Sequence, residues 1–307
     1  MRSFFLYLLF LPILFTIAAC DEDSFSQVVN IPIPEHEPLP VLSLNLQTGD
    51  TLAKALLGVS RGILDEFDEN DNRGAKLELY QDDVLIGMGS YGVSSGRFWQ
   101  GMQLSEPITG NAATYRLVGQ LEGFEPVEAT QAMPTVPVFE NVRYTRDGAI
   151  DSEGFRVDEV EFDLIDPPGE ENFYAFRVSV AEQACIFDPL TGESRCREDT
   201  TRLNSLFLTS PDPLLSDGLD FDFVLSDQSF DGTRYRVRLQ ADNFTEFIPF
   251  LEVFHLSEDA YRYMRSFAAY QESRDNPFAE PVQVHNNVVG GYGAFIIANK
   301  ALRRLEE

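Results

Sequence analysis

The sequence predicts a mainly β protein made of two β-sandwich domains, the first immunoglobulin-like, with one short helix near the C-terminus of the second. Two observations predict this class. Apolar and polar residues alternate over many short segments, which is the period of half-buried strands. The apolar fraction is 44%, with 25 Phe and 11 Tyr, so the chain can build packed cores despite its high charge.

The N-terminus reads as a bacterial export signal. One charge at Arg2 is followed by an apolar run over residues 4–17, and Ile17-Ala18-Ala19 precede Cys20. The run is shorter than the ~20 apolar residues that a spanning helix needs. Small residues before a cysteine resemble the lipobox of lipoprotein signal peptidase. We expect residues 1–19 to be removed and Cys20 to be lipidated and membrane-anchored; an ordinary signal peptide with a chance cysteine is the alternative.

Residues 20–40 read as an extended tether. Prolines recur in Ile31-Pro32-Ile33-Pro34 and Pro38-Leu39-Pro40, and proline cannot join the interior of a sheet. The triplet Asp21-Glu22-Asp23 resembles the signal that exports Bacteroidota-type lipoproteins to the cell surface. The expected location is therefore the outer membrane, facing the exterior. A solvated acidic linker is the alternative reading of the triplet.

Residues 41–137 form the predicted immunoglobulin-like domain. Its expected strands are 41–46, 75–80, 84–87, 97–99 and 114–119. Short strands separated by turn residues, without a helical period, are typical of such a sandwich. Pro134-Thr135-Val136-Pro137 marks the domain boundary.

Residues 138–307 form the second β-rich domain. Its expected strands are 157–164, 173–180, 205–208, 219–225, 235–239 and 252–256. A helix is expected from Ser257 to about Ser273, because Ser257 can cap the free amides and acidic residues favour the first turn. Tyr261, Met264 and Ala268 would share its apolar face.

Two cysteines remain after lipidation. Cys185 and Cys196 flank Asp188-Pro189-Leu190-Thr191-Gly192, a turn-rich stretch that predicts a hairpin with the cysteines opposite each other. In an exported protein a disulfide is the expected state, adding roughly 2 to 3 kcal/mol by the chain-entropy account. Two free thiols are the alternative, and the lack of a nearby histidine disfavours a metal pair.

Charge excludes one class of partner. The chain has 50 acidic and 23 basic residues, a net charge of −27. Loss of Arg2 with the signal peptide makes the mature chain one unit more negative. Such a charge repels phosphate backbones, so nucleic acid is not an expected partner.

A search for chemistry assigns no catalytic residue, no metal and no cofactor. Of the histidines, His36 lies in the tether, His255 alternates with apolar neighbours as a sheet histidine does, and His285 is expected to be exposed, with ligand binding as an alternative. The acidic run 65–74 fails as a calcium loop, because Arg73 stands where glycine is required; a solvated loop is favoured. Core packing is expected for Trp99, with a ligand platform as the alternative.

The last third of the chain resembles a known family. Its motifs are the helix beginning Ser257-Glu258-Asp259, the run Asn276-Pro277-Phe278-Ala279-Glu280-Pro281, the pair Asn286-Asn287, and Gly291-Tyr292-Gly293-Ala294-Phe295. Together they resemble the C-terminal signature of the Bacteroidota domain of unknown function 4249 lipoproteins, and the resemblance extends over nearly the whole mature chain. Tyr292 stands where many members carry leucine, and His285 where serine or tyrosine is common.

The resemblance also carries the functional expectation. The family has no assigned catalytic residues, so none is transferred to this chain. The resemblance implies that the gene for this protein lies near genes for TonB-dependent receptors. The expected function is a non-enzymatic outer-membrane lipoprotein accessory to a TonB-dependent receptor, for substrate capture or stabilisation of the complex. An independent glycan- or peptide-binding lipoprotein or adhesin is the alternative, and the binding residues are not assigned.

Overall fold

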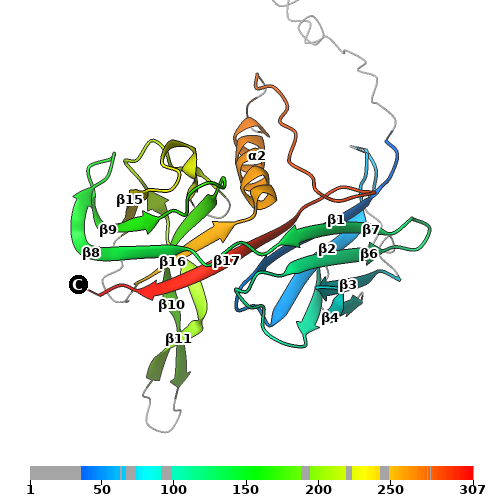
Figure 1. Ribbon diagram of the computed structural model, residues 1–307, viewed down its shortest axis with the longest axis horizontal. Helices are drawn as coiled ribbons and strands as arrows, with labels where there is room; N and C mark the ends of the chain where they lie inside the picture. The colour runs from blue at the N-terminus through cyan, green and yellow to red at the C-terminus, as the bar shows by residue number, and fades with distance from the viewer. Residues whose placement is uncertain are drawn as a thin grey trace, which may run out of the picture. The chain divides into compact units, whose positions relative to one another are not determined.

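Strands dominate the computed structural model, as the alternating sequence predicts (Figure 1). The structure describes residues 36–62, 64–66, 74–90, 99–187, 194–218, 223–242, 249–274, 276 and 278–306. Two units separate at Glu37, and the fold below is that of the unit Pro38–Glu307. None of the described helices is both long and apolar enough to span a membrane.

The first part of this unit is one continuous sheet. Its strands follow the order β1-β2-β5-β4-β3-β6-β7, each antiparallel to its neighbours. The predicted immunoglobulin-like sandwich is therefore not confirmed, because these strands share one hydrogen-bonded path instead of two packed sheets. The bounds are β1 (Pro40–Gln47), β2 (Leu52–Val59), β3 (Lys76–Gln81), β4 (Val84–Ser90), β5 (Trp99–Leu104), β6 (Thr114–Gln120) and β7 (Val127–Ala132).

The last strand of the chain completes the core of this first part. Strand β17 (Phe295–Arg304) pairs in parallel with β1, with Leu44 opposite Phe295. Side chains alternate along a strand, so Phe295 and Ile297 enter the same core as Leu42 and Leu44. A segment more than 150 residues beyond the predicted boundary at 137 thus fills the N-terminal core.

The residues before β17 bridge β1 and β7. Tyr292 forms a parallel bridge with Val41, and Val289 an antiparallel bridge with Glu128. Contact with β1 is so close that a Cβ on Gly293, whose φ is +124°, would lie 1.9 Å from the Leu42 carbonyl oxygen. Only glycine fits here, because any side chain would overlap the β1 backbone.

The second part contains two sheets. A four-stranded sheet has the order β12-β15-β9-β8, and the long sheet continues as β13-β14-β10-β16-β17, with β11 paired to β10. The bounds are β8 (Val138–Ile150), β9 (Arg156–Ile165), β10 (Phe173–Phe187), β11 (Ser194–Ser205), β12 (Leu208–Thr209), β13 (Ser216–Asp217), β14 (Phe223–Ser226), β15 (Arg234–Ala241) and β16 (Pro249–Leu256), with a 3-10 turn at Asp227–Ser229.

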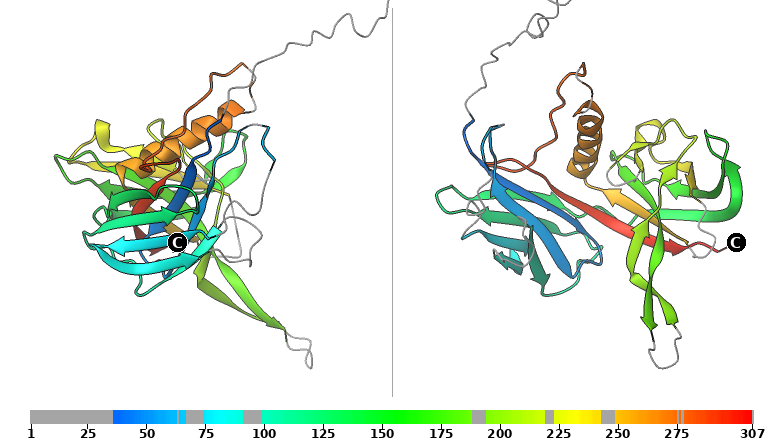
Figure 2. Two further views of the ribbon diagram at one scale, coloured as in Figure 1. Left: turned by 90° about the vertical axis from the view of Figure 1, so that its right-hand side faces the viewer. Right: turned by 180° about the vertical axis from the view of Figure 1, so that it is seen from behind.

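Three layers pack in this second part. Tyr174 and Phe176 of β10 face a core shared with the four-stranded sheet, whereas Phe173 and Ala175 face the helix α2 (Glu258–Arg274) on the other side. Figure 2 shows α2, in orange, beside the strands of this second part. Because both faces of the central strands are covered, all eight residues of β16 are buried.

The helix and most strands lie where the sequence predicts them. Ser257 caps α2, since its Oγ accepts a hydrogen bond from the Ala260 amide at 3.2 Å, and the helix ends one residue beyond the predicted Ser273. A mainly β protein with a helix near the C-terminus is confirmed. Strands β2, β7, β8, β13 and β17 were not predicted individually, and Leu206 and Phe207 join two strands instead of forming one. The division into two domains at 137 stays a prediction.

Candidate functional site

Of the predicted covalent sites, the structure describes the cysteine hairpin but not the lipidation site. Cys20, the signal peptide and most of the tether lie outside the described residues. The predicted hairpin is confirmed, because β10 and β11 are antiparallel with Cys185 directly opposite Cys196 in the register. Figure 1 shows this hairpin extending beyond the rest of the sheet. The disulfide itself stays a prediction.

The C-terminal signature forms a hydrogen-bonded network at the start of α2. The Asp259 carboxylate accepts hydrogen bonds from Gln131 Nε2 at 2.5 Å, His285 Nε2 at 2.7 Å and Asn287 Nδ2 at 3.2 Å. Burial alone would raise the pKa of Asp259, but these three donors and the His285 charge lower it below its usual value. The network joins β7, α2 and the segment before β17.

Asn287 carries the network onward to β17. Its Oδ1 accepts from the Phe295 amide at 2.9 Å, and its Nδ2 donates to the Phe295 carbonyl at 2.7 Å. This pair replaces the backbone partners that a regular strand would supply. The signature residues thus hold the chain where it enters the first core.

His285 is half-buried, so the expectation of an exposed side chain is wrong. Its side chain is 22% exposed and its ring is paired with Asp259. Its backbone amide donates to Ser266 Oγ at 2.8 Å. Both contacts fix the position of the ring against α2.

His255 is a satisfied sheet histidine, as predicted. It lies buried in β16, its Nδ1 is 2.9 Å from the Thr135 carbonyl oxygen, and its ring stacks on Tyr174. Burial lowers its pKa. Buried Asn299 contacts the same segment between β7 and β8, because its Nδ2 donates a hydrogen bond to the Pro134 carbonyl oxygen at 2.9 Å. His36 is exposed and belongs to the other unit.

An acidic cleft of 580 Å³ opens on one side of the network. Its walls are the end of β7 with residues 133–135, the loop 167–173 and the start of α2. Four carboxylates line it: Glu170, Glu171, Glu258 and Asp259. Their shared charge favours cationic groups over anionic ones.

A second depression is lined by basic instead of acidic side chains, and we call it the arginine groove. It has a volume of 710 Å³ and lies between α2 and the extended segment 283–286. The described residues that line it include no carboxylate: Tyr261, Arg262, Arg265, Ser266, Gln283, Val284, His285 and Asn286. Guanidinium groups in such a groove can bind anionic oxygen atoms.

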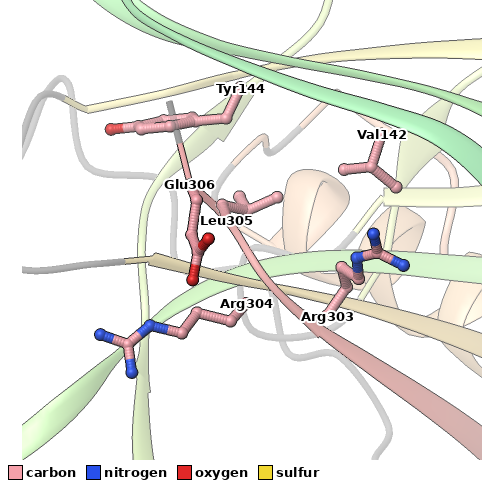
Figure 3. Close-up of a pocket in the computed structure, with 6 residues that line it drawn as sticks. All are labelled: Val142, Tyr144, Arg303, Arg304, Leu305 and Glu306. Atoms are coloured by element: carbon pink, nitrogen blue, oxygen red, sulfur yellow. The ribbon is translucent and has the colours of Figure 1, made fainter.

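A third pocket, of 380 Å³, lies between β8 and the end of β17 (Figure 3). Val142, Tyr144 and the stretch Arg303 to Glu306 line it. Figure 3 shows Arg303 and Arg304 pointing in different directions. The Tyr144 hydroxyl donates to Asp158, and burial with this bond raises the pKa of Tyr144 to about 12. The hydroxyl is therefore held as a neutral donor.

Three aspartates of the second part lie close together. Carboxylate oxygens of Asp166, Asp227 and Asp231 lie within 4.8 Å of one another. Burial, and the charges of the other two, raise the pKa of Asp227. Each carboxylate already accepts hydrogen bonds from the protein, with donors Tyr174 and Gly232 to Asp166, Asn172 to Asp227, and Gly169 to Asp231. These bonds tie the loop 166–172 to the turn 227–233.

Other candidates from the sequence are not brought together with the network. Most of the acidic run 65–74 lies outside the described residues, as does the side chain of Trp99. Conversely, no sequence pattern marked Gln131 or Arg265, and Asp259 was expected only as an acid in the first turn of the helix and as part of the family signature. The spacing of Arg262 and Arg265 on a predicted helix places them on one face, which is the signal that could have found the groove.

Comparison with known proteins places the chain in a family. Comparison with curated proteins gave no match. Among solved structures, a DUF4785 family protein from Legionella pneumophila is similar at 11% identity and a TM-score of 0.23, over 69% of this chain and 51% of that one, so this chain spans about half its length. The B domain of a biofilm associated protein is similar at 6% identity and a TM-score of 0.20, over 86% and 85%.

The family model for a domain of unknown function, DUF4249, matches residues 27–304. Its range contains β1 through β17 and the whole network around Asp259. The chain therefore belongs to the DUF4249 family.

Proposed function

We propose that this protein is a non-enzymatic lipoprotein of the outer membrane, facing the cell exterior, that assists a TonB-dependent receptor by capturing substrate or stabilising the complex. The observation that carries the proposal is Cys20 behind Ile17-Ala18-Ala19 in a chain of the DUF4249 family. A lipid at this position anchors everything that follows, and three acyl chains suffice for stable attachment.

The acidic triplet and the tether support the location. Asp21-Glu22-Asp23 follows the anchor directly, and Pro38 begins the folded unit. About 18 tether residues can span up to roughly 60 Å when fully extended. This reach lets the folded unit contact a receptor in the same membrane.

Two steps test the anchor and its location. In the native bacterium, an alkyne fatty acid should label the protein, and Cys20→Ser should abolish the label and release the protein from membranes. The triple variant Asp21→Asn, Glu22→Gln, Asp23→Asn should keep the label but lose cleavage by protease added to intact cells. Equal labelling of Cys20→Ser would refute the lipoprotein, and unchanged cleavage of the triple variant would refute the export signal.

The receptor is tested by affinity purification. The tagged, lipidated protein should recover a TonB-dependent receptor from solubilised outer membranes, with a tagged unrelated lipoprotein as the control. Recovery of no receptor, or of the same receptor with both baits, would contradict the accessory role.

A second candidate function is an independent glycan- or peptide-binding lipoprotein. The arginine groove and the acidic cleft favour it, because both are large enough for a small ligand. A glycan array probed with the unlipidated mature chain tests for such a ligand. Glycan binding together with recovery of no receptor in the affinity purification would favour this alternative over the first.

A further inference from the structure

The arginine groove concentrates positive charge in a strongly acidic protein. Arg262 and Arg265 are three positions apart on α2, so both side chains lie on one face of the helix. The chain as a whole has a net charge of −27, yet the described residues lining this groove carry no acid. An anion that approaches the protein is therefore favoured here over most of the surface.

Contacts hold one residue on each wall of the groove in place. The Tyr261 ring stacks on Phe173 with centroids 4.6 Å apart. His285 is held by Asp259 and Ser266 on the opposite wall. Because these side chains are already fixed, less conformational entropy is lost in ordering them when a ligand binds.

The two arginines differ in how available they are. Arg262 forms an ion pair with Glu258 one turn before it, and both side chains are more than half exposed. Arg265 is exposed, and no ion pair of Arg265 is found among the described residues. Arg265 can offer its full guanidinium fork to a ligand, and Arg262 can add its charge after competing with Glu258.

Polar groups beside the arginines suit a ligand with hydroxyl or amide groups. Gln283 lines the groove beside the two cations, and the volume of 710 Å³ lies within the range of small-molecule sites. A bare anion would leave most of this volume unfilled.

We infer that the arginine groove binds a small ligand through an anionic oxygen group, a carboxylate or sulfate, which Arg265 contacts directly. The inference gives a ligand class to the capture role, and in that respect it rests on the proposed function. It concerns the folded unit alone, so a failed receptor purification leaves it standing, and a failure to bind anions leaves the receptor role standing.

Calorimetry on the unlipidated mature chain tests the inference with four probes. Trigalacturonate presents carboxylates on sugars, citrate and inorganic sulfate present the anion alone, and maltotriose is a neutral sugar. At least one anionic probe should bind at low salt, weaken as salt is added, and bind at least about tenfold more weakly to Arg265→Gln. Tighter binding of trigalacturonate than of citrate or sulfate assigns the anion to a sugar; the reverse order assigns a free anion.

Matched variants separate the groove from net charge. Arg303→Gln removes the same charge from an exposed position in another pocket and should bind like the parent protein. Arg265→Lys keeps the charge but not the fork and should bind with intermediate affinity. Failure of all three anionic probes to bind, equal losses in Arg265→Gln and Arg303→Gln, or equally tight binding of maltotriose would each overturn the inference. Unchanged thermal unfolding of the variants shows that the fold is intact.

Discussion

Replacing Gly293 by alanine should unfold the junction between the two ends of the chain. The new Cβ would lie 1.9 Å from the Leu42 carbonyl oxygen, whereas ordinary contact begins at 3.4 Å, so β1 and residue 293 would have to separate by about 1.5 Å. The three nearest atoms are all backbone atoms of Leu42, so no side chain can rotate away to make room.

The cost follows from what that separation breaks. Three backbone hydrogen bonds cross this junction: Tyr292 to Pro40 at 2.9 Å, Leu42 to Tyr292 at 2.8 Å and Leu44 to Ala294 at 3.0 Å. Each contributes about 1 kcal/mol net, and a non-glycine residue at a φ of +124° adds about 1–3 kcal/mol of strain. We therefore expect a loss of about 4 kcal/mol or more in the free energy of unfolding.

The assay is urea and thermal unfolding of the unlipidated mature chain. Trp99, the single tryptophan, lies in β5 and reports on the first part by fluorescence. For a chain of this length about 4 kcal/mol lowers Tm by roughly 10 °C. If alanine proves too disruptive to purify, hydrogen exchange on the parent protein should still show β1 and β17 protected together.

Two other glycines separate crowding from backbone strain. Gly123 has a φ of +85° and nothing within 4 Å of a new Cβ, so Gly123→Ala should cost only the strain, about 1 kcal/mol. A Cβ on Gly101 would meet only the Leu52 side chain at 3.6 Å, so Gly101→Ala should be near neutral. A loss in Gly293→Ala no larger than that in Gly123→Ala would refute the close packing on β1.

Three further predictions follow from the described contacts. First, burial lowers the pKa of His255, so the unfolded chain takes up a proton below about pH 6.5 before the folded protein does. The free energy of unfolding should therefore fall as the pH drops from about 6.5 to 5. In urea titrations, His255→Gln should weaken this pH dependence, and an unchanged dependence would show that His255 is not its source. Second, Asp259→Asn should lower the free energy of unfolding by about 1–2 kcal/mol, because it removes a part-exposed carboxylate with three donors. Glu258→Gln in the same turn removes only an exposed ion pair and should lower it by under about 0.5 kcal/mol. Equal losses for the two variants in thermal unfolding would contradict the network. Third, mass spectrometry of the protein from its native membrane should find Cys185 and Cys196 joined, with Tm lowered by reductant; two alkylated thiols in freshly isolated protein would show that the opposed cysteines are not bonded.

Much of the fold follows from local sequence. Alternation predicts β1, β3, β6, β9 and β15, because each packs one face on a core and leaves the other partly exposed. The cap at Ser257 and the apolar face with Met264 predict α2, and both rest on contacts within one helix and its supporting sheet. The hairpin with Cys185 opposite Cys196 is likewise local, because its two strands are close together in the chain.

Strands that are buried on both faces are harder to predict. Strand β16 has eight buried residues and no alternation, so only part of it was expected. Strand β8 was missed for the opposite reason, since most of its residues are exposed and no apolar face stands out in its sequence. In each case the neighbours of the strand, which the sequence does not reveal, decide what faces water.

The candidate sites divide in the same way. The sequence alone determined the lipobox-like stretch before Cys20, the acidic balance and the family resemblance, because each is a property of residues adjacent in the chain or of total charge. Only the tertiary structure decided that Gln131 and His285 meet at Asp259, and that Arg265 lines a groove with residues 283–286. It also decided that Phe295 fills the core of the first part. Contacts between residues so far apart depend on which strands pair, and strand pairing is settled by the packing of whole faces and not by any short segment.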